Sequence, residues 1–327
     1  MKRALITGSQ GQDGFYLSKH LLELGYEVWG GVRRWPDTHA SELMDDVNYV
    51  YCDVRDGQSI DVALRKSVPD EIYNLAGQVF VPTSWDHPEE TFDVNATGFL
   101  RLMQSVKRIC PEARVYQACT SEMYGNTGGY LDETSPMNPT SPYGIAKYAA
   151  HKTARMYREM GLFVCSGILF NHESPKRGRE MVTRKITSHV ATWMLNEEYR
   201  LKLKLGNMQA VRDWGFAGDY VKAMRLMLQQ DQPDDYVVAS GETHTIDQFW
   251  AEAVSVAGIT TEEALAFTEV SKSLLRVNDT MHLWGNANKA KTVLGWKPEV
   301  SFKELVRMMI EADYELVSRR GAKAVGV

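Results

Sequence analysis

The sequence has few of the features that mark secreted, membrane or disulfide-rich proteins. Its 327 residues include only four cysteines, Cys52, Cys110, Cys119 and Cys165, and they form no C-x-x-C pair. Such widely separated cysteines do not make a disulfide framework, so we expect free thiols in a reducing cytosol. No stretch approaches the ~18 apolar residues of a membrane span, and the start of the sequence shows no signal-peptide core. We therefore expect a cytoplasmic protein without a membrane partner.

Excess positive charge and metal-binding motifs are also absent. The 37 Lys and Arg residues face 42 Asp and Glu residues, for a net charge of −5, so a nucleic-acid partner is not expected. The eight histidines form no H-x-x-x-H or H-E-x-x-H pair, so we expect no metal. With 44% hydrophobic and 24% charged residues, the composition is that of a globular enzyme.

Short β-rich runs alternate with helical patterns in the first half, which predicts a doubly wound parallel sheet of the Rossmann type. We expect residues 1–170 to form this domain and residues 171–327 to form mainly a smaller C-terminal α+β lobe, with a return of the chain to the large domain as a second option. A long helix is expected over Phe92 to Val106. The expected strands are Ala4–Thr7, Glu27–Val32, Tyr49–Cys52, Glu71–Leu75, Arg114–Ala118, Phe163–Leu169 and, later in the chain, Tyr236–Ala239.

Three glycines with the spacing G-x-x-G-x-x-G follow the first expected strand. Gly8, Gly11 and Gly14 also open the first expected helix. Glycines allow backbone N–H groups to approach a pyrophosphate at the positive end of a helix. This context favours a dinucleotide-binding loop over a merely flexible connection.

An arginine pair, Arg33-Arg34, follows the second strand, where an enzyme that uses NAD usually has Asp or Glu. Two guanidinium groups suit a ribose 2′-phosphate and leave no carboxylate to repel it, so NADP is the expected cofactor. The alternative is a pair of solvated surface arginines. Asp53 and Val54, after the third strand, are expected near the adenine.

Tyr143 and Lys147 are four residues apart at the start of an expected helix whose first position is Pro142. Residues at this spacing share one helical face. An ammonium beside a phenol, with a cationic nicotinamide nearby, is expected to lower the pKa of Tyr143 and make it a usable base. The alternative is an ordinary amphipathic helix.

A hydroxyl-rich segment, Thr120-Ser-Glu-Met-Tyr-Gly125, follows the fifth strand, at the edge where open α/β sheets bind ligands. Oxidation of an alcohol needs only Tyr143 and a hydroxyl donor. Glu122 therefore suggests a second proton transfer, at the carbon next to a newly formed ketone. The alternative is that Glu122 caps the following turn.

Together these motifs resemble the extended short-chain dehydrogenase/reductase family and, within it, the GDP-mannose 4,6-dehydratases. The resemblance also includes Asn74-Leu-Ala-Gly-Gln78, Gly167-Ile-Leu-Phe-Asn-His-Glu-Ser-Pro-Lys-Arg-Gly178, Val182-Thr-Arg-Lys-Ile186 and Arg212-Asp-Trp-Gly215. It implies an NADP-dependent lyase that converts GDP-mannose to GDP-4-keto-6-deoxy-mannose by internal hydride transfer.

The resemblance also implies roles for single residues. Tyr143 and Lys147 would serve oxidation at C4, Glu122 would remove the C5 proton, and Thr120 with Glu122 would help the C6 hydroxyl leave. Cofactor contacts are implied for Gly8, Gln10, Gly11, Gln12, Asp13, Gly14, Arg33, Asp53, Val54, Leu75, Ala76, Gln78, Tyr143, Lys147, His172 and Arg177. Contacts with the GDP-sugar are implied for Ser84, Ser121, Asn171, Lys185, Arg212 and Arg276, and a homodimer or homotetramer is implied as the assembly.

The chain departs from the family pattern at three places. Residues 35–39 replace a serine-rich loop that reaches a neighbouring subunit, Glu90 replaces an aromatic residue near the cofactor ribose, and Val277-Asn-Asp-Thr280 replaces a proline and a glutamate. A dehydratase of a related GDP-heptose therefore stays open. A nucleotide-sugar 4-reductase or 4-epimerase, which does not need Glu122, stays open as well, and so does a non-catalytic NADP-sensing protein.

Overall fold

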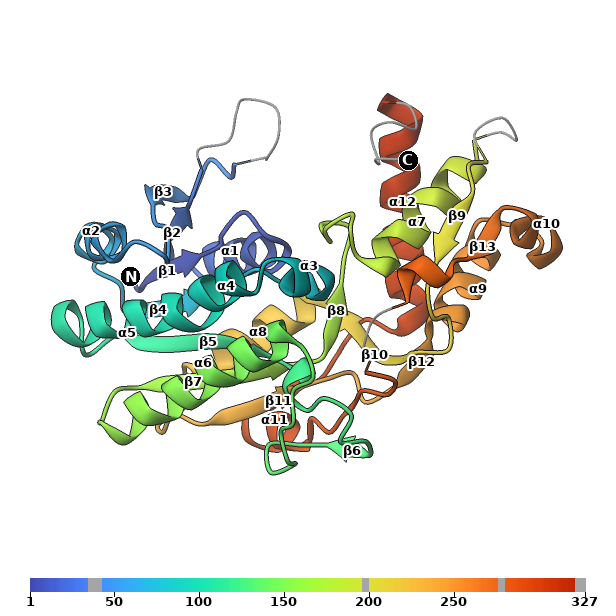
Figure 1. The fold of residues 1–327 in the computed structure, drawn as a ribbon. Coiled ribbons are helices and arrows are strands. Elements are labelled where there is room, and N and C mark those ends of the chain that lie inside the picture. Colours follow the sequence, from blue (N-terminus) through green and yellow to red (C-terminus); the bar gives the residue numbers. More distant parts are fainter. Residues whose placement is uncertain (35–42, 196–199, 276–279, 321–327) are drawn as a thin grey trace.

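The computed structural model describes residues 1–34, 43–195, 200–275 and 280–320 (Figure 1). Within these ranges no helix combines the length and the apolar character needed to cross a membrane. All four cysteines lie in the described part of the chain and carry free thiols, as expected.

A seven-stranded parallel sheet forms the larger lobe, in the spatial order β3-β2-β1-β4-β5-β7-β11. The Rossmann fold predicted from the sequence is confirmed, and most strand boundaries differ from expectation by one or two residues. The strands are β1 (Arg3–Thr7), β2 (Glu27–Val32), β3 (Asn48–Tyr51), β4 (Glu71–Asn74), β5 (Arg114–Thr120), β7 (Val164–Leu169) and β11 (Asp235–Val238).

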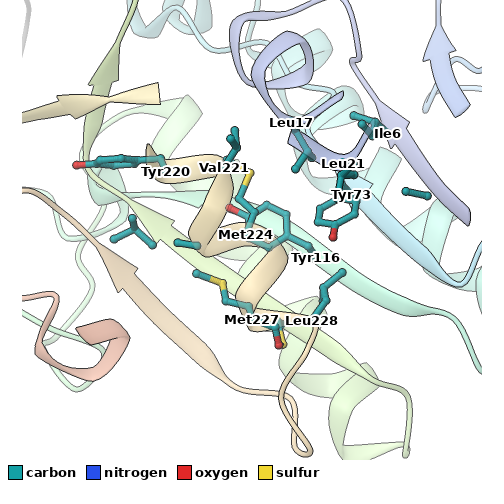
Figure 2. Packing of buried hydrophobic residues seen from close by; sticks show 14 of the residues in the cluster. Ile6, Leu17, Leu21, Tyr73, Tyr116, Tyr220, Val221, Met224, Met227 and Leu228 are labelled. Atoms are coloured by element: carbon teal, nitrogen blue, oxygen red, sulfur yellow. The ribbon is translucent and has the colours of Figure 1, made fainter. Parts of the chain in front are cut away.

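Helices cover both faces of this sheet. One face is buried under α1 (Gln12–Glu23), α8 (Ala217–Met227) and α11 (Asn288–Val293). Figure 2 shows Val221, Met224 and Met227 of α8 near Tyr116 and Tyr73 of the sheet, with Leu17 and Leu21 of α1 alongside. The other face is buried under α2 (Gly57–Ser67), α5 (Gly98–Ile109) and α6 (Pro142–Glu159).

The long helix expected over Phe92 to Val106 is interrupted. After α3 (Val81–Asp86), α4 (Pro88–Phe92) leads into a π-helical segment, Asp93–Thr97, before α5 begins. Asn95 in the π-helical segment is buried and pairs with the backbone of Gln78 in both directions, at 3.0 and 2.8 Å. Such wide turns are frequent at functional sites, and this one ties the helix to the loop after β4.

The smaller lobe is built from α7 (Val182–Trp193), α9 (Ile246–Val256), α10 (Thr261–Ala266) and α12 (Phe302–Arg320), which share a hydrophobic core (Figure 1). A capping box of Thr245 and Gln248 starts α9, and Ser301 and Glu304 make the reciprocal bonds of a second one at the start of α12. The remaining strands are β8 (Asn171–Glu173), β10 (Val211–Phe216) and β12 (Thr243–Thr245) in one sheet, β9 (Leu203–Leu205) with β13 (Thr268–Val270), and β6 (Tyr130–Leu131) with β14 (Trp284–Gly285). Two short 3-10 turns, Ser121–Met123 and Lys272–Leu274, complete the described elements.

The chain enters the large sheet once more after the start of the smaller lobe. Strand β11, expected at Tyr236–Ala239, begins at Asp235 and pairs in parallel with β7 of the large sheet. The exact division of the chain at residue 170 stays a prediction.

Candidate active site

A cavity of about 300 Å³ lies at the carboxyl ends of β5 and β7, where the large sheet meets the smaller lobe. This is the edge at which ligands of open α/β sheets bind. The cavity brings together all four residues expected to be catalytic. The expected site residues that line it are Asp13, Leu75, Thr120, Ser121, Glu122, Tyr143, Lys147, Asn171, His172, Arg177, Lys185 and Arg212.

The glycine loop has a geometry that side chains would disrupt. Gly8 has a φ of +70°, and a Cβ there would lie 2.8 Å from the backbone N of Ala76. A Cβ on Gly14 would lie 2.5 Å from the carbonyl oxygen of Ser9. Gly11 is the N-cap of α1 and has no side chain with which to cap that helix. A helix N-terminus that begins with a glycine cap beside close-packed glycines fits a dinucleotide diphosphate.

Tyr143 is positioned by the first turn of α6. Ser141 caps the helix, its Oγ accepting from the Gly144 backbone N at 3.1 Å, and Pro142 occupies the first position, as expected. A Cβ on Gly144 would lie only 2.8 Å from the carbonyl oxygen of Glu122. This close approach of α6 to the turn after β5 brings Tyr143 and Glu122 into the same cavity.

The lowering of the Tyr143 pKa was expected beside a cationic nicotinamide, and in the protein without a cofactor the shift has the opposite direction. Burial raises the pKa of Tyr143, and the negative charge of Glu122 adds to this, while a hydrogen bond with Thr120 opposes it. Lys147 is buried as well, and its Nζ donates to the carbonyl oxygen of Ala118 at 3.0 Å. Burial also lowers the pKa of Lys147, because it disfavours the charged form.

Thr120 caps the 3-10 turn that contains Glu122, and within the described ranges no capping bond from the Glu122 carboxyl to the following turn is found. The Thr120 Oγ1 accepts from the Glu122 backbone N at 3.2 Å and starts the 3-10 turn. Glu122 lines the cavity, and the hydroxyl of Thr280 donates to its carboxyl at 3.5 Å. Thr280 is buried and comes from the segment that precedes β14, far away in the sequence.

Two motifs that are 159 residues apart meet beside the cavity. His172 Nε2 lies 2.9 Å from a carboxylate oxygen of Asp13, and His172 Nδ1 lies 2.8 Å from the carbonyl oxygen of Phe170. The Asp13 carboxylate raises the pKa of His172 against the opposing effect of burial. Gln12 donates to the carbonyl oxygen of His172 and accepts from Ser174, so the glycine loop is fixed to β8.

Cationic side chains line the part of the cavity that faces the smaller lobe. Arg212 is buried and donates to the carbonyl oxygen of Val211, and Lys185 donates to that of Lys204. Arg177 Nε lies 3.0 Å from Glu173. These positive charges on an acidic protein suit an anionic ligand such as a nucleoside diphosphate.

Of the expected substrate contacts that the structure describes, Ser84 does not line the cavity. Ser84 is fully buried, and its hydroxyl donates to the carbonyl oxygen of Val81 within α3, whose first residues line the cavity. Arg276 lies outside the described residues, as do residues 35–39 and most of the segment that follows Arg276.

The arginine pair alone predicted no carboxylate at the end of the site near Arg33, but the Glu90 carboxylate lies there. Glu90 lies 4.0 Å from Arg33 and 3.5 Å from Arg55, measured between the carboxylate oxygen and the guanidinium nitrogens. Arg55 in turn binds both oxygens of Asp53, at 2.7 to 3.2 Å, and lowers the Asp53 pKa. The arginine pair is therefore not a purely cationic site.

The other expected cofactor contacts surround the glycine loop. Thr7 Oγ1 accepts from the backbone N of Ala76, while Val54 packs close to Gly98. Gln78 donates to the carbonyl oxygen of Phe80, and its Oε1 is buried without a hydrogen-bond partner among the described residues. A buried acceptor without a partner is costly, and a ligand that donates to it would remove that cost. Gln10 lies in the loop between Gly8 and Gly11.

Sequence reasoning missed several residues of this site. Ser174 lies in the Asn-His-Glu-Ser-Pro block, so its motif was a usable signal. Arg55, Lys204, Asn207 and Thr280 carry no local motif, and only the fold brings them to the site.

The glycine loop, the Tyr-x-x-x-Lys pair and the lobe beside the carboxyl edge define an enzyme of the extended short-chain dehydrogenase/reductase class. A sequence model of a family described as GDP-mannose 4,6 dehydratase matches residues 5–309. GDP-mannose 4,6 dehydratase 2 of Arabidopsis thaliana is 46% identical over 334 residues, which cover 97% of this chain and 88% of the relative. The chain belongs to the GDP-mannose 4,6-dehydratase family.

Solved structures show how widely this fold is shared. A UDP-glucose 4-epimerase of Thermus thermophilus in complex with NAD superimposes with a TM-score of 0.83 at 25% identity, covering 95% of this chain and 98% of the epimerase. RMD from Pseudomonas aeruginosa, complexed with NADPH, gives a TM-score of 0.78 at 21% identity, covering 96% and 99%. The fold alone therefore does not identify the reaction or the dinucleotide.

Proposed function

We propose that the protein converts GDP-mannose to GDP-4-keto-6-deoxy-mannose with a bound NADP. The observation that carries this proposal is the meeting of Thr120, Glu122, Tyr143 and Lys147 in one cavity. An oxidoreductase that acts only at C4 has no use for a carboxyl beside the phenol. A dehydratase needs a second group to take the proton at C5.

The glycine loop and its neighbours fit the dinucleotide. Gly8, Gly11 and Gly14 would hold the diphosphate at the start of α1, and Arg33 would hold the ribose 2′-phosphate that distinguishes NADP from NAD. When bound, the cofactor would supply an acceptor for the C4 hydride and a donor of the same hydride to C6, and its oxidised nicotinamide would carry a positive charge.

Tyr143 takes the proton from the sugar O4 in the first step. In the protein alone burial raises the pKa of this phenol further, so a positive charge in the cavity would help to favour the phenolate. Thr120 assists through its hydrogen bond, and the buried ammonium of Lys147 stands one helical turn away. The oxidation leaves a ketone at C4, which acidifies the hydrogen on C5.

Glu122 removes the C5 proton, and Thr120 with Glu122 helps the C6 hydroxyl leave as water. After reduction at C6, C5 regains a proton from Tyr143, which thereby gives up the proton that it took from O4. The Thr120 and Glu122 side chains come from neighbouring positions at the end of β5, and the Thr120 Oγ1 bond to the Glu122 backbone fixes the turn that holds both. The buried environment of Tyr143 limits access of water, which protects the reactive intermediate. Lys185 and Arg212 provide positive charge for the GDP diphosphate.

Product analysis tests the proposal. Purified protein incubated with GDP-mannose and NADP should give a product that has lost one water, detected by mass spectrometry. A product that retains the 6-hydroxyl would instead support a 4-reductase or epimerase. GDP-heptose is tested as a second substrate. If the protein dehydrates GDP-heptose and not GDP-mannose, the proposed identity of the sugar is wrong.

We also propose that the enzyme is a homodimer or homotetramer. Helices α3, α4 and α6 pack against one another and carry exposed apolar side chains, Trp85, Phe92, Ile145 and Met156. Apolar surface of this kind is typical of contacts between subunits. Light scattering on the purified protein measures the mass, and a monomer at micromolar concentration would contradict the proposal.

A cytoplasmic location is proposed from the four free thiols, three of which are buried. Fractionation of cells that express the tagged full-length chain checks this, and recovery with an oxidising compartment would contradict it.

A further inference from the structure

Four charged side chains alternate in sign where β2 and β3 end. The row runs from Arg33 through Glu90 to Arg55 and then to Asp53, with closest contacts of 4.0, 3.5 and 2.7 Å. Asp53 is buried and bound by Arg55 through several contacts, so Arg55 is fixed from one side. Glu90, on the short helix α4, contacts both arginines and is exposed to solvent.

We propose that Glu90 determines dinucleotide selectivity by lowering the preference for NADP over NAD, and that Arg55 is the second cation of this site. The proposal rests on the proposed function only in requiring that the protein binds a nicotinamide dinucleotide. The family pattern implied only that Glu90 lies near the cofactor ribose. The ion pairs with Arg33 and Arg55 give this carboxylate a specific role.

The physical reason is competition for two guanidinium groups. A 2′-phosphate carries about two negative charges and binds best to arginines that are not already paired. Here the Glu90 carboxylate lies near both arginines, so the phosphate has to displace it or tolerate its repulsion. A ribose 2′-hydroxyl, as in NAD, would instead interact favourably with Glu90, because a hydroxyl donates a hydrogen bond to a carboxylate.

The expected size of the effect follows from exposure. Arg33 and Glu90 are 47% and 50% exposed, and Arg55 is 36% exposed. Charges at such positions are well screened, so we expect a change in the NADP dissociation constant of about threefold to tenfold rather than of several orders of magnitude. The change should also decrease with added salt, because screening weakens both the ion pairs and the repulsion.

The test compares Glu90→Gln with Glu89→Gln in the full chain. Glu89 lies in the same helical turn, is exposed and has no ion pair within the described ranges, so it is a matched control for loss of one charge. Dissociation constants for NADP and for NAD are measured by isothermal titration calorimetry at low salt and at about 0.5 M salt. These constants report binding and do not depend on turnover.

We expect Glu90→Gln to tighten NADP about threefold to tenfold at low salt and to leave NAD unchanged or weaker. Glu89→Gln should leave the ratio of the two constants unchanged, and Arg55→Gln should weaken NADP more than NAD. If Glu90→Gln changes the ratio no more than Glu89→Gln does, or tightens both dinucleotides equally, the assignment of Glu90 is overturned.

The failure of this inference can be distinguished from the failure of the proposed function. If the wild type binds a dinucleotide and dehydrates GDP-mannose while the Glu90→Gln ratio is unchanged, only the role of Glu90 is lost. If the wild type binds neither dinucleotide, both proposals fail. Glu90→Ala provides a second variant, and circular dichroism melting of each variant verifies that it is folded.

Discussion

The two ends of the proposed dinucleotide site differ in how they use charge. At the catalytic end Tyr143 and Lys147 are 7% and 4% exposed, and each is held by backbone or hydroxyl groups of the protein. At the adenosine end Arg33 and Glu90 are about half exposed, and the ion pairs there join them to one another and to Arg55. Buried groups interact strongly and keep one geometry, whereas exposed charges contribute little and adapt.

This difference indicates that the reaction depends mainly on the buried end of the site, and that the choice of dinucleotide depends mainly on the exposed end. Burial is the largest cause of the pKa shifts of Tyr143 and Lys147. Removing one polar atom from the buried end therefore changes the environment of the neighbouring polar groups. Removing one charge from the exposed end changes only electrostatic interactions that water and salt already screen. The largest effects of substitution are therefore expected at Tyr143 and Glu122, and smaller ones at the arginines.

Tyr143→Phe tests the buried end most directly. The variant lacks the hydroxyl that is proposed to take the O4 proton, so we expect kcat to fall by roughly 10²- to 10⁴-fold. Calorimetry should show nearly unchanged dinucleotide affinity, because the aromatic ring remains. Residual activity within about tenfold of the wild type would contradict the assignment.

Glu122→Gln separates oxidation at C4 from the later proton transfer. The amide keeps the shape of the side chain and cannot take the C5 proton, so we expect turnover to fall by about 10²-fold or more. Mass spectrometry in deuterium oxide measures exchange at C5, which should be suppressed while GDP-mannose and NADP still bind. Exchange at the wild-type rate would show that another group is the base.

Arg33→Asp tests the exposed end. A carboxylate in place of the guanidinium removes a partner of the 2′-phosphate and adds repulsion, so we expect NADP to bind at least about tenfold more weakly. NAD should bind about as well as before, and Arg34→Asp is the matched control. An unchanged ratio of the two dissociation constants would mean that the 2′-phosphate is held elsewhere.

The two ends were not equally predictable from the sequence. The alternation of strand and helix patterns predicted the sheet, and the glycine spacing predicted the loop. Both are local features of the sequence, because close packing at positions such as Gly8 and Gly14 requires a glycine at that position. The spacing of Tyr143 and Lys147 placed both on one helix. It could not give the direction of the Tyr143 pKa shift, because burial depends on chain segments that are remote in the sequence.

The remaining features depend on contacts between distant residues. Glu90 follows Arg33 by more than two elements, and nothing in its own helix indicates that it turns toward Arg33 and Arg55. The pair of Asp13 with His172 likewise needs β8 to lie beside the glycine loop. The π-helical turn at Asp93–Thr97 was missed because a uniform helical period cannot show one extra residue in a turn.

Thr280→Val sharpens the comparison with the smallest expected effect. The Thr280 hydroxyl is 3.5 Å from the Glu122 carboxylate, so we infer that it helps to orient this carboxylate. Valine keeps the shape and removes the donor, and kcat should fall about threefold to tenfold with little change in KM.

Thr280→Ser distinguishes positioning from packing. Serine restores the hydroxyl but lacks the methyl group, so it should recover the wild-type rate of C5 deuterium exchange that valine loses. If serine and valine slow exchange equally, the methyl group supports the loop and the hydroxyl is not needed. If neither slows it, Glu122 is oriented by the turn at Thr120 alone, and the buried end depends on fewer remote contacts than the adenosine end.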